Sequence, residues 1–411
     1  MTRIGMVSII GAGLSGLCLA QGLNKRGLPF RVFEAEQTPE TRNQGYRISL
    51  DENGIRALEE CLPTHLFDLF QATSGIPGGS FQMLRGDLNP IFRFRFDLKE
   101  GDDPRYAPRQ VDRGILRRLL MLGIEDHVTF NRSLSQVHLT DSEAKLFFAD
   151  GTFNSSELVV GADGARSKLK DALGYPSAKH LGANAIYGRT PLRDGLLDPI
   201  LANGGSIAIG PPGRAFFSTS MKFANPPAPT FESFGFDGSP VEVAPYVMWA
   251  VIFPANENEA ILRNPESLHA MAREEAKAFH PAIRRVIDAA CVGHTLLVPL
   301  RASLPFHRNA VPNATLMGDA VHLMPPFRAQ GGNTALLDAA DLTRSLARAF
   351  EGGSSIASEL REYEALVADR GRDQINASTK MMKIMAATNP VLRFALLKFI
   401  PWFRTAILRK S

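Results

Sequence analysis

Residues 6–35 read MVSIIGAGLSGLCLAQGLNKRGLPFRVFEA. Within this stretch, Met6–Ile10 is an apolar run typical of a short, buried parallel strand. Ser15–Lys25 carries apolar residues at helical spacing, Gly27 ends this helix, and Phe30–Phe33 is a second strand. A strand, a helix and a strand within about 30 residues predict a βαβ unit with a right-handed crossover, and therefore a parallel sheet.

The turn between the first strand and the helix, GAGLSG, has the G-x-G-x-x-G spacing of a dinucleotide-binding loop. Its glycines allow a tight turn, a close approach of a pyrophosphate, and close packing of helix on strand. Glu34 ends the second strand, where a carboxylate can accept hydrogen bonds from ribose hydroxyls. The alternative is a glycine-rich turn without a ligand. The residues predicted to contact the dinucleotide are Gly11, Gly13, Leu14, Ser15, Gly16, Glu34 and Ala35.

The rest of the chain predicts a second domain inserted into the first. From about residue 175 to 305 the composition changes, and strands are separated by loops rich in Pro and Gly. We therefore predict an α/β fold: a Rossmann-type domain from residues 1–174 and 306–352, a mainly antiparallel substrate domain at 175–305, and C-terminal helices at 353–411. The strands expected in the inserted domain are Ala185–Thr190, Ile207–Gly210, Ala215–Lys222 and Val247–Phe253.

A hairpin is predicted within the first part of the Rossmann-type domain. Ser80–Leu84 is followed by a turn-forming segment, and Phe92 and Phe94 then alternate with arginines. Alternation of this kind is typical of a half-buried strand.

The composition limits the classes of partner. The chain has 411 residues, of which 45% are hydrophobic and 21% charged, and its formal net charge is +4. Because no basic block with interleaved aromatics is present, we expect no nucleic acid partner. Cys18, Cys61 and Cys291 lie far apart and the histidines lack ligand spacing, so we predict neither disulfides nor a metal site. These features predict a cytoplasmic protein.

The uncharged run Ile4–Asn24 belongs to the βαβ unit rather than to a signal peptide or a spanning helix, because glycines interrupt it.

Two further motifs lie at ends of predicted strands. Residues 159–167 read VVGADGARS and residues 316–326 read LMGDAVHLMPP. Together with GAGLSG, their order and spacing over residues 6–350 resemble the group A flavoprotein monooxygenases, the family of the FAD-dependent aromatic hydroxylases. The resemblance implies a glutathione reductase-like fold with FAD as the cofactor.

The resemblance also implies roles for individual residues. In the family, the aspartate at the position of Asp319 bonds a ribityl hydroxyl of the flavin, and the arginine at the position of Arg113 contacts the flavin. The helix that begins near Gly331 is expected to point its positive end at the flavin's pyrimidine ring. A helix-capping role for Asp319 and a surface salt bridge for Arg113 are the alternatives. The cofactor residues implied in this way are Arg113, Asp163, Gly164, Asp319, Gly331, Gly332 and Asn333.

The family chemistry implies that NAD(P)H reduces the flavin, that O₂ adds to form a flavin hydroperoxide, and that one oxygen atom passes to the substrate. Only one G-x-G-x-x-G lies between a strand and a helix, so NAD(P)H is expected to visit and to dock near the Asp-Gly motif. The catalytic candidates are Arg189, Arg47 and Pro325. Arg189 could stabilise a phenolate or enolate; a structural ion pair is the alternative.

Several predicted strands offer residues for a substrate site in the inserted domain. We expect a small apolar substrate, aromatic or polyketide-like, that is hydroxylated or epoxidised; oxygen insertion beside a ketone is a further alternative. The residues considered for this site are Tyr187, Arg189, Phe216, Phe217, Met248 and Trp249.

Two departures from the family pattern are present. Ala329 stands where the family commonly has glycine, and Lys170 where it commonly has arginine. Because alanine disfavours positive φ, we expect the loop over the flavin to take a different path. Lysine keeps the charge at position 170 but loses the fork geometry of arginine.

The tail Val391–Lys410 is apolar with interspersed basic residues. It is expected either to pack on its own domain or to make peripheral membrane contact.

Two other functions remain open for the chain: a flavin reductase that saturates prenyl-type double bonds, and a non-catalytic FAD-binding protein. The choice between NADH and NADPH and the oligomeric state also remain open.

Overall fold

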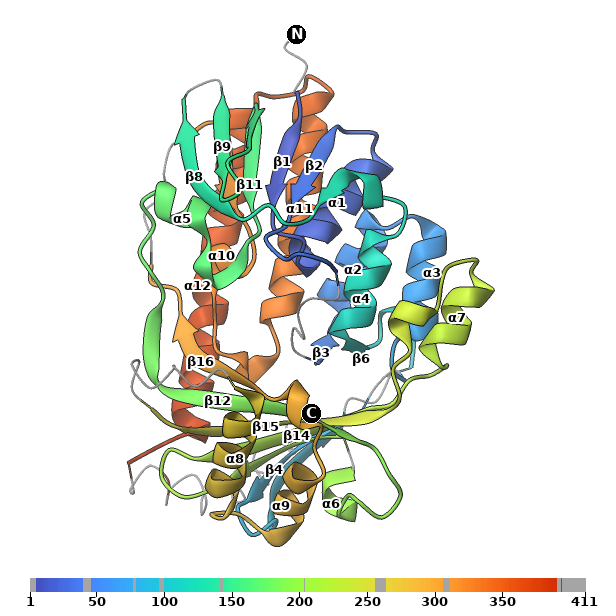
Figure 1. Cartoon of the computed structure of the whole chain (residues 1–411), viewed down its shortest axis with the longest axis vertical. Helices are drawn as coiled ribbons and strands as arrows, with labels where there is room; N and C mark the ends of the chain where they lie inside the picture. Colours follow the sequence, from blue (N-terminus) through green and yellow to red (C-terminus); the bar gives the residue numbers. More distant parts are fainter. Residues whose placement is uncertain are drawn as a thin grey trace.

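The computed structural model describes residues 5–39, 46–76, 79–95, 100–140, 143–202, 204–255, 264–305, 311–389 and 393. A parallel sheet with its helices forms one end of the molecule, and a seven-stranded sheet forms the other (Figure 1). Two long helices, α11 (Gly331–Phe350) and α12 (Ile356–Met385), pack on each other, and α12 reaches from the first sheet to the second.

The parallel sheet confirms the predicted βαβ unit. Its strand order is β17-β11-β1-β2-β7, and all neighbouring pairs are parallel. Helix α1 (Leu14–Lys25) connects β1 to β2. Because parallel strands end at one edge, the turns that follow β1, β11 and β17 are neighbours. The strands are β1 (Val7–Ile10), β2 (Phe30–Phe33), β7 (Val128–Thr129), β11 (Leu158–Gly161) and β17 (Ala314–Leu316).

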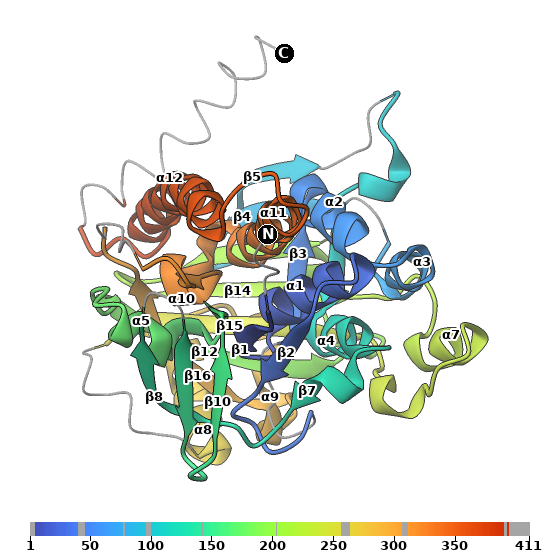
Figure 2. The same ribbon diagram turned by 90° about the horizontal axis from the view of Figure 1, so that it is seen from above.

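The two faces of this sheet are covered differently (Figure 2). Helices α1, α4 and α11 lie on one face, and α1 packs against both of the others. A three-stranded antiparallel sheet lies on the other face, where the rings of Phe33 and Phe148 are 4.9 Å apart. Together these layers enclose the larger apolar core. The remaining elements of this end are α2 (Glu52–Cys61), α3 (Thr64–Thr73), α4 (Arg113–Met121), α5 (Lys168–Ala172), α10 (Asp319–His322), β8 (Leu134–Leu139), β9 (Ala144–Phe148) and β10 (Phe153–Ser156).

The second sheet has the order β16-β12-β15-β14-β13-β4-β5, and every pair except β13–β4 is antiparallel. Helices α8 and α9 cover one face of this sheet, and the other face is turned toward the parallel-sheet end (Figure 1). The elements are β4 (Ser80–Arg85), β5 (Pro90–Arg95), β12 (Lys179–Pro191), β13 (Gly205–Ile209), β14 (Ala215–Met221), β15 (Tyr246–Pro254), β16 (Leu296–Ala302), α6 (Pro199–Ala202), α7 (Pro227–Ser233), α8 (Pro265–Ala276) and α9 (Pro281–Asp288).

This sheet extends beyond the predicted range 175–305, which is a correction. The predicted hairpin forms, but β4 pairs in parallel with β13, where Gly205 lies opposite Phe81, so both hairpin strands join the antiparallel sheet. Hydrogen bonding between strands far apart in sequence leaves no local pattern, and for this reason the sequence placed the hairpin in the wrong domain.

The burial of the hairpin's second strand also differs from the prediction. Ile91 takes the buried position of β5, whereas Phe94 is 51% exposed. β5 is the edge strand of its sheet, so of the two alternating phenylalanines only Phe92 is half-buried and packs against the sheet's apolar cluster.

The helical predictions for the last part of the chain are confirmed up to Met385, where α12 ends. Among the described helices, none is both long and apolar enough to cross a membrane. The predicted membrane contact of Val391–Lys410 lies outside the described residues, apart from Arg393. Its guanidinium donates to the carbonyl oxygen of Gly210 at 2.5 Å.

Candidate active site

The three glycine-containing turns meet at one edge of the parallel sheet. A Cβ placed on Gly11 would lie 2.5 Å from the carbonyl oxygen of Ala162, so the first turn needs glycine to approach the Asp-Gly turn. A Cβ placed on Gly318 would lie 3.1 Å from the Oγ of Ser15. The Gly-Asp turn therefore touches the start of α1, and residues 150 to 300 positions apart form one site.

The first turn of α1 is free to bind an anion. No side chain of the described residues caps this helix, and its first turn contains no acidic residue. A Cβ placed on Gly13 would meet nothing within 4 Å, so the space beside the turn is open to a ligand. Unpaired N–H groups at a helix N-terminus favour phosphate. These features fit the pyrophosphate of a dinucleotide.

Glu34 is held at the end of β2 by the protein itself. Its Oε2 accepts a hydrogen bond from the Ala12 N–H at 2.6 Å, and its Oε1 accepts one from the Glu36 N–H at 3.0 Å. Arg117, which the sequence analysis missed, donates to the Ala12 carbonyl at 2.8 Å and to the Glu36 carboxylate at 2.8 Å. It lies one helical turn after Arg113 on α4, and this i,i+4 spacing is the signal that could have identified it.

The Asp-Gly turn is shaped by Asp163. Its Oδ2 accepts a hydrogen bond from the Lys168 N–H at 3.0 Å, and Gly164 has a φ of +75°. Its Oδ1 is buried and has no partner among the described residues. Burial raises the pKa of this carboxyl above its ordinary value. The nearby Lys170 is buried, and burial lowers the pKa of its ammonium group.

Asp319 projects from the edge beside the start of α11. It follows Gly318, whose φ is +59°, and its side chain is exposed. A Cβ placed on Gly331 would lie 3.9 Å from the Asp319 Oδ1, so the carboxylate and the N-terminus of α11 face the same space. No described side chain caps α11. This pair of features fits a ligand that carries both hydroxyl groups and partial negative charge.

Asn333 uses its side chain inside the protein. The amide oxygen accepts a hydrogen bond from the Asp51 N–H at 3.0 Å, and the amide nitrogen donates to the carbonyls of Ser49 at 3.0 Å and Ala329 at 2.9 Å. The side chain thereby fixes β3 (Arg47–Leu50) against α11. Only the backbone N–H of Asn333 stays available for the predicted contact with a cofactor.

A buried ionic network of α11 and α12 holds the Gly-Asp turn in place. Asp338, on α11, accepts hydrogen bonds from the Gly318 N–H at 2.9 Å, from the His322 Nε2 at 2.5 Å and from Arg370 of α12 at 2.5 Å. Asp338 and His322 are both buried. Gly371 lets α12 approach, because a Cβ there would lie 2.8 Å from the His322 Cβ. His322 is therefore a structural residue of the turn.

The face of the second sheet that is turned toward this edge carries aromatic and apolar side chains. Across the three neighbouring strands β12, β15 and β14, Tyr187, Ala250 and Phe217 lie side by side. Two residues further along β12, Arg189 lies opposite Met248 of β15. Leu296 packs with this group. Phe216 and Trp249, which were also considered for the substrate site, lie on the other face and pack under α8 and α9. Alternation along each strand separates the two sets.

Polar residues join the two ends of the molecule at this face. The Tyr246 hydroxyl donates to the Asp112 Oδ2 at 2.7 Å, and Asp112 also caps α4, which begins at Arg113. Arg47 pairs with Asp112 in the β3–β6 ladder, where β6 is Arg109–Asp112. Burial lowers the pKa of the Arg47 guanidinium to about 9, which leaves it charged at neutral pH. Pro325 is buried between α10 and the turn that leads to α11.

Two domain models and a group of FAD-dependent monooxygenases match this chain. A model of the FAD binding domain matches residues 304–378, and a model of the NAD(P)-binding Rossmann-like domain matches residues 9–71. The chain is 28% identical to the FAD-dependent monooxygenase dbaB of Emericella nidulans, over 84% of this chain and 87% of that protein. The chain is therefore similar to FAD-dependent monooxygenases over most of its length.

A second relative of this monooxygenase family is a larger protein. The chain is 28% identical to the dual O-methyltransferase/FAD-dependent monooxygenase CTB3 of Cercospora beticola over 90% of this chain, but spans only 45% of the relative's length. Among solved structures, Klebsiella pneumoniae HpxO complexed with FAD and uric acid has a TM-score of 0.77 at 22% identity, covering 98% of this chain and 95% of that one. That likeness confirms the fold.

FAD is the cofactor of this family and of the matched domain. The residues at the edge of the parallel sheet fit FAD. The start of α1 has no capping side chain, the side of Gly13 is open, and the Asp319 side chain is exposed, so all three are available to a ligand. Among the described residues, no group of His, Cys, Asp and Glu could hold a metal ion.

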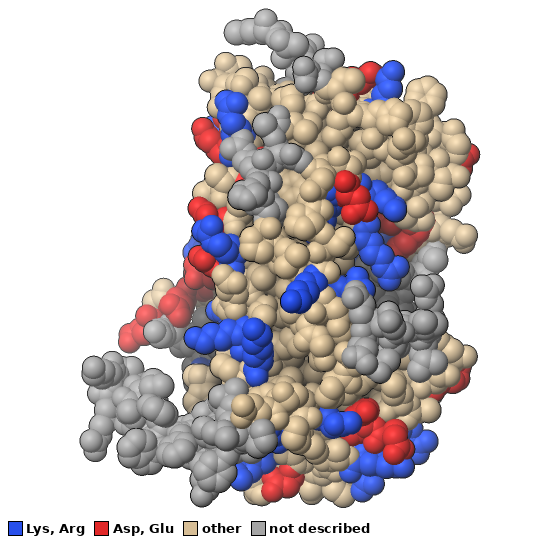
Figure 3. All heavy atoms as spheres, turned by 90° about the vertical axis from the view of Figure 1, so that its left-hand side faces the viewer, with Lys and Arg blue, Asp and Glu red and all other residues tan. Residues whose placement is uncertain are grey.

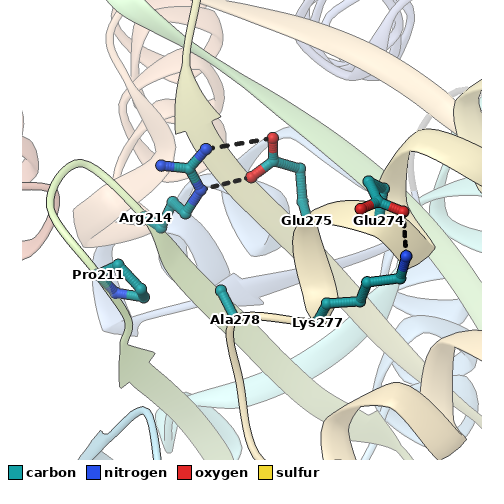
Figure 4. Close-up of a pocket in the computed structure, with 6 residues that line it drawn as sticks. All are labelled: Pro211, Arg214, Glu274, Glu275, Lys277 and Ala278. Carbon is teal, nitrogen blue, oxygen red and sulfur yellow. Dashed lines mark hydrogen bonds and ion pairs between the residues drawn. The ribbon is translucent and has the colours of Figure 1, made fainter.

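A separate pocket lies outside this site. It has a volume of about 410 Å³ and is lined by the turn between β13 and β14, by the end of α8 and by the two residues that follow α8 (Figure 4). The charged side chains in it are paired, since Arg214 binds Glu275 and Lys277 binds Glu274. None of its lining residues belongs to the three motifs, so it lies apart from the candidate active site.

Ala329, at which we expected an altered loop path, lies in the left-handed region despite its side chain. Ala329 has a φ of +53° and a ψ of 28°, in the left-handed region. The hydrogen bond from Asn333 to the Ala329 carbonyl helps to hold it there. An alanine tolerates this conformation at a cost of about 1–2 kcal/mol.

We therefore expect Ala329→Gly to raise the free energy of unfolding by about 1 kcal/mol, since glycine adopts this φ without steric cost. Urea denaturation measures the change. Ala365→Gly is the matched control: Ala365 is exposed in the middle of α12, and glycine there should lower stability by about 1 kcal/mol. Equal losses in both variants would contradict the strained conformation at Ala329.

Proposed function

We propose that this chain is an NAD(P)H- and FAD-dependent monooxygenase that places one oxygen atom of O₂ into a small, planar, largely apolar substrate. The observation that carries this proposal is the arrangement of two surfaces. The edge that fits FAD and the aromatic face of the second sheet are turned toward each other, and the β3–β6 pair joins them. A substrate bound on that face would lie beside the cofactor.

Most residues of the proposed site have binding roles. Bound FAD would accept a hydride from NAD(P)H and activate O₂. The chain's own groups hold and orient it: α1 faces the pyrophosphate, Glu34 the ribose, and the start of α11 the pyrimidine ring. The proposed cofactor residues are Gly11, Gly13, Leu14, Ser15, Gly16, Glu34, Ala35, Arg113, Asp163, Gly164, Asp319, Gly331, Gly332 and Asn333.

Three residues are proposed on the reacting side. Arg47 lies on β3 and Arg189 on β12, and their positive charges are proposed to orient a substrate oxygen. Pro325 holds the turn between the Gly-Asp motif and α11. The apolar side chains Tyr187 and Phe217 exclude water from the reacting atoms and favour a flat, apolar substrate. HpxO, solved with uric acid, is a related fold that binds a flat ring system.

NAD(P)H is proposed to visit the site. The NAD(P)-binding Rossmann-like match covers residues 9–71, the same βαβ unit that fits FAD, so it indicates no second dinucleotide site. Lys and Arg side chains gather across the middle of the face on the side of α5 and α12 (Figure 3). A positive surface near the Asp-Gly turn suits the phosphates of a docking nicotinamide.

The test combines a spectrum with isotope labelling. The purified protein is expected to carry bound FAD and to consume NADPH faster when a suitable aromatic compound is added. Under heavy O₂, one labelled oxygen atom should appear in the product. Turnover without label would support the double-bond reductase instead. FAD binding without any NADPH or NADH consumption stimulated by an aromatic panel would support a non-catalytic protein.

A further inference from the structure

A polar cluster lies where the second sheet meets β3 and β6. We call it the arginine–histidine cluster and define it as Tyr46, Asp112, Arg189, Tyr246 and His294. The ring of Tyr46 lies edge-on to Tyr246 at 6.3 Å and to His294 at 6.4 Å. His294, which the sequence analysis did not select, comes from the short turn before β16.

Arg189 has no acidic partner in this cluster. One of its terminal nitrogens lies 3.5 Å from the His294 Nε2, and its guanidinium lies 5.2 Å from the centre of the Tyr246 ring. Among the described residues, no carboxylate forms an ion pair with Arg189. Asp112, the carboxylate of the cluster, already accepts hydrogen bonds from the Tyr246 hydroxyl and from two N–H groups at the start of α4. The guanidinium charge is therefore left without a bonded counter-charge.

The contact with Arg189 decides the state of His294. An arginine only donates hydrogen bonds, so the Nε2 of His294 must accept, and the ring proton then lies on Nδ1. Burial lowers the pKa of His294, and the neighbouring Arg189 lowers it further. The imidazole is thus neutral: it orients the guanidinium without adding a second charge or cancelling the first.

Two buried polar atoms, one in the cluster and one on the next residue of the chain, also lack partners. The Tyr46 hydroxyl has none among the described residues, although this side chain is only 5% exposed. The same is true of the Nε of Arg47, a residue that is 9% exposed. Buried groups of this kind are normally hydrogen-bonded, and an oxygen atom of a bound ligand would supply the missing partner.

We infer that the substrate is an anion, with an ionised oxygen attached to a flat conjugated body, and that Arg189 binds this oxygen while His294 positions Arg189. The inference rests on the proposed function, because it places the substrate on the same face of the second sheet. The conjugated body would lie along Tyr187, Phe217 and Met248. A phenolate, an enolate or a carboxylate shares this chemistry. An ionised hydroxyl also raises the electron density of the ring carbon that receives oxygen, and its proton goes to solvent on binding.

The test measures binding to the FAD-loaded protein with four probes. Two are 2-naphthol and 2-naphthoate; the others are their neutral analogues, 2-methoxynaphthalene and methyl 2-naphthoate. Binding is followed by naphthalene fluorescence, and the absorbance of 2-naphthol reports its ionisation. We expect at least one probe that can ionise to bind tenfold or more tightly than its neutral analogue. Preference for 2-naphthol, with its ionisation shifted to lower pH, identifies a hydroxyl site; preference for 2-naphthoate identifies a carboxylate site.

Variants of the two residues distinguish the charge of Arg189 from its positioning by His294. Arg189→Gln should abolish the preference, and Arg189→Lys should keep part of it. His294→Leu should weaken the preference several-fold with FAD still bound, whereas His294→Gln, whose amide oxygen can still accept from Arg189, should restore it. Arg214→Gln is the matched control, because Arg214 flanks the same sheet but is paired with Glu275 in the outer pocket (Figure 4).

Two results would overturn the inference: a wild-type protein that binds neither ionisable probe more tightly than its neutral analogue, or an Arg189→Gln variant that keeps the full preference. The outcome is independent of oxygenation. A protein with this preference that incorporates no heavy oxygen would refute the proposed function and leave the anion site standing.

Discussion

Asp338→Ala is expected to lower the free energy of unfolding by about 3–5 kcal/mol, because it leaves a buried cation without its partner. Asp338 is fully buried and accepts from His322 at 2.5 Å and from Arg370 at 2.5 Å. It also accepts from the N–H of Gly318 at 2.9 Å, so the variant should weaken FAD binding as the Gly-Asp turn loosens.

Urea denaturation followed by circular dichroism measures this loss. Asp369→Ala is the control, since Asp369 pairs with Arg372 at 2.7 Å on the surface of α12 and its side chain is 71% exposed. That variant should change stability by no more than about 0.5 kcal/mol. A similar small change in both variants would show that the network is not needed for the fold.

The stabilisation by this network should depend on pH. Burial alone lowers the pKa of His322, but the Asp338 carboxylate outweighs burial and raises it. The contribution of His322 is therefore full below its unfolded value of about 6.5 and is lost as pH rises through the raised value. Burial raises the pKa of Asp338, but His322 and Arg370 outweigh it and lower the pKa. Its contribution is present above about pH 4 and is lost as pH falls through the lowered value.

The stability difference between the wild type and Asp338→Ala should therefore be largest between about pH 4 and 6.5. The same urea titrations, repeated across this range and at alkaline pH, measure it. A difference that does not vary with pH would contradict a charged His322–Asp338 pair.

Asp319→Ala is expected to weaken FAD binding by roughly 10- to 100-fold, the effect of losing a hydrogen bond to a charged group. Asp319 is exposed beside the open start of α11, where the proposal places the flavin's ribityl chain. Because the side chain is exposed in the absence of ligand, the stability of the apoprotein should be almost unchanged. This separates Asp319, proposed to touch the cofactor, from Asp338, which supports the turn.

Flavin fluorescence titration of the apoprotein measures the dissociation constant. Asp319→Asn should lose less affinity than Asp319→Ala, since the amide keeps one acceptor oxygen. Asp369→Ala again serves as the control and should bind FAD like the wild type. Unchanged FAD affinity in Asp319→Ala would refute the proposed contact, even if the protein still carried the cofactor.

The sequence by itself was sufficient for the βαβ unit at the centre of the parallel sheet. The strand Met6–Ile10, the helix after it and the strand Phe30–Phe33 were correctly predicted, because each depends on local spacing and on turn residues. The convergence of the three motifs also followed from sequence. Strands that run in parallel end at one edge, which puts the turns at Gly11, Asp163 and Gly318 on the same edge, and the observed order β17-β11-β1 makes them neighbours.

Only the tertiary structure decided which strands form the second sheet and which side chains meet beside it. The membership of β4 in the second sheet depends on its pairing with β13. The burial of Phe216 and Trp249 on the face away from the candidate site depends on where α8 and α9 pack. The contacts of Arg117 with Glu36 and of Arg189 with His294 join residues 81 and 105 positions apart. Such pairs leave no local periodicity, because their energy arises from packing and charge between elements that meet only after folding.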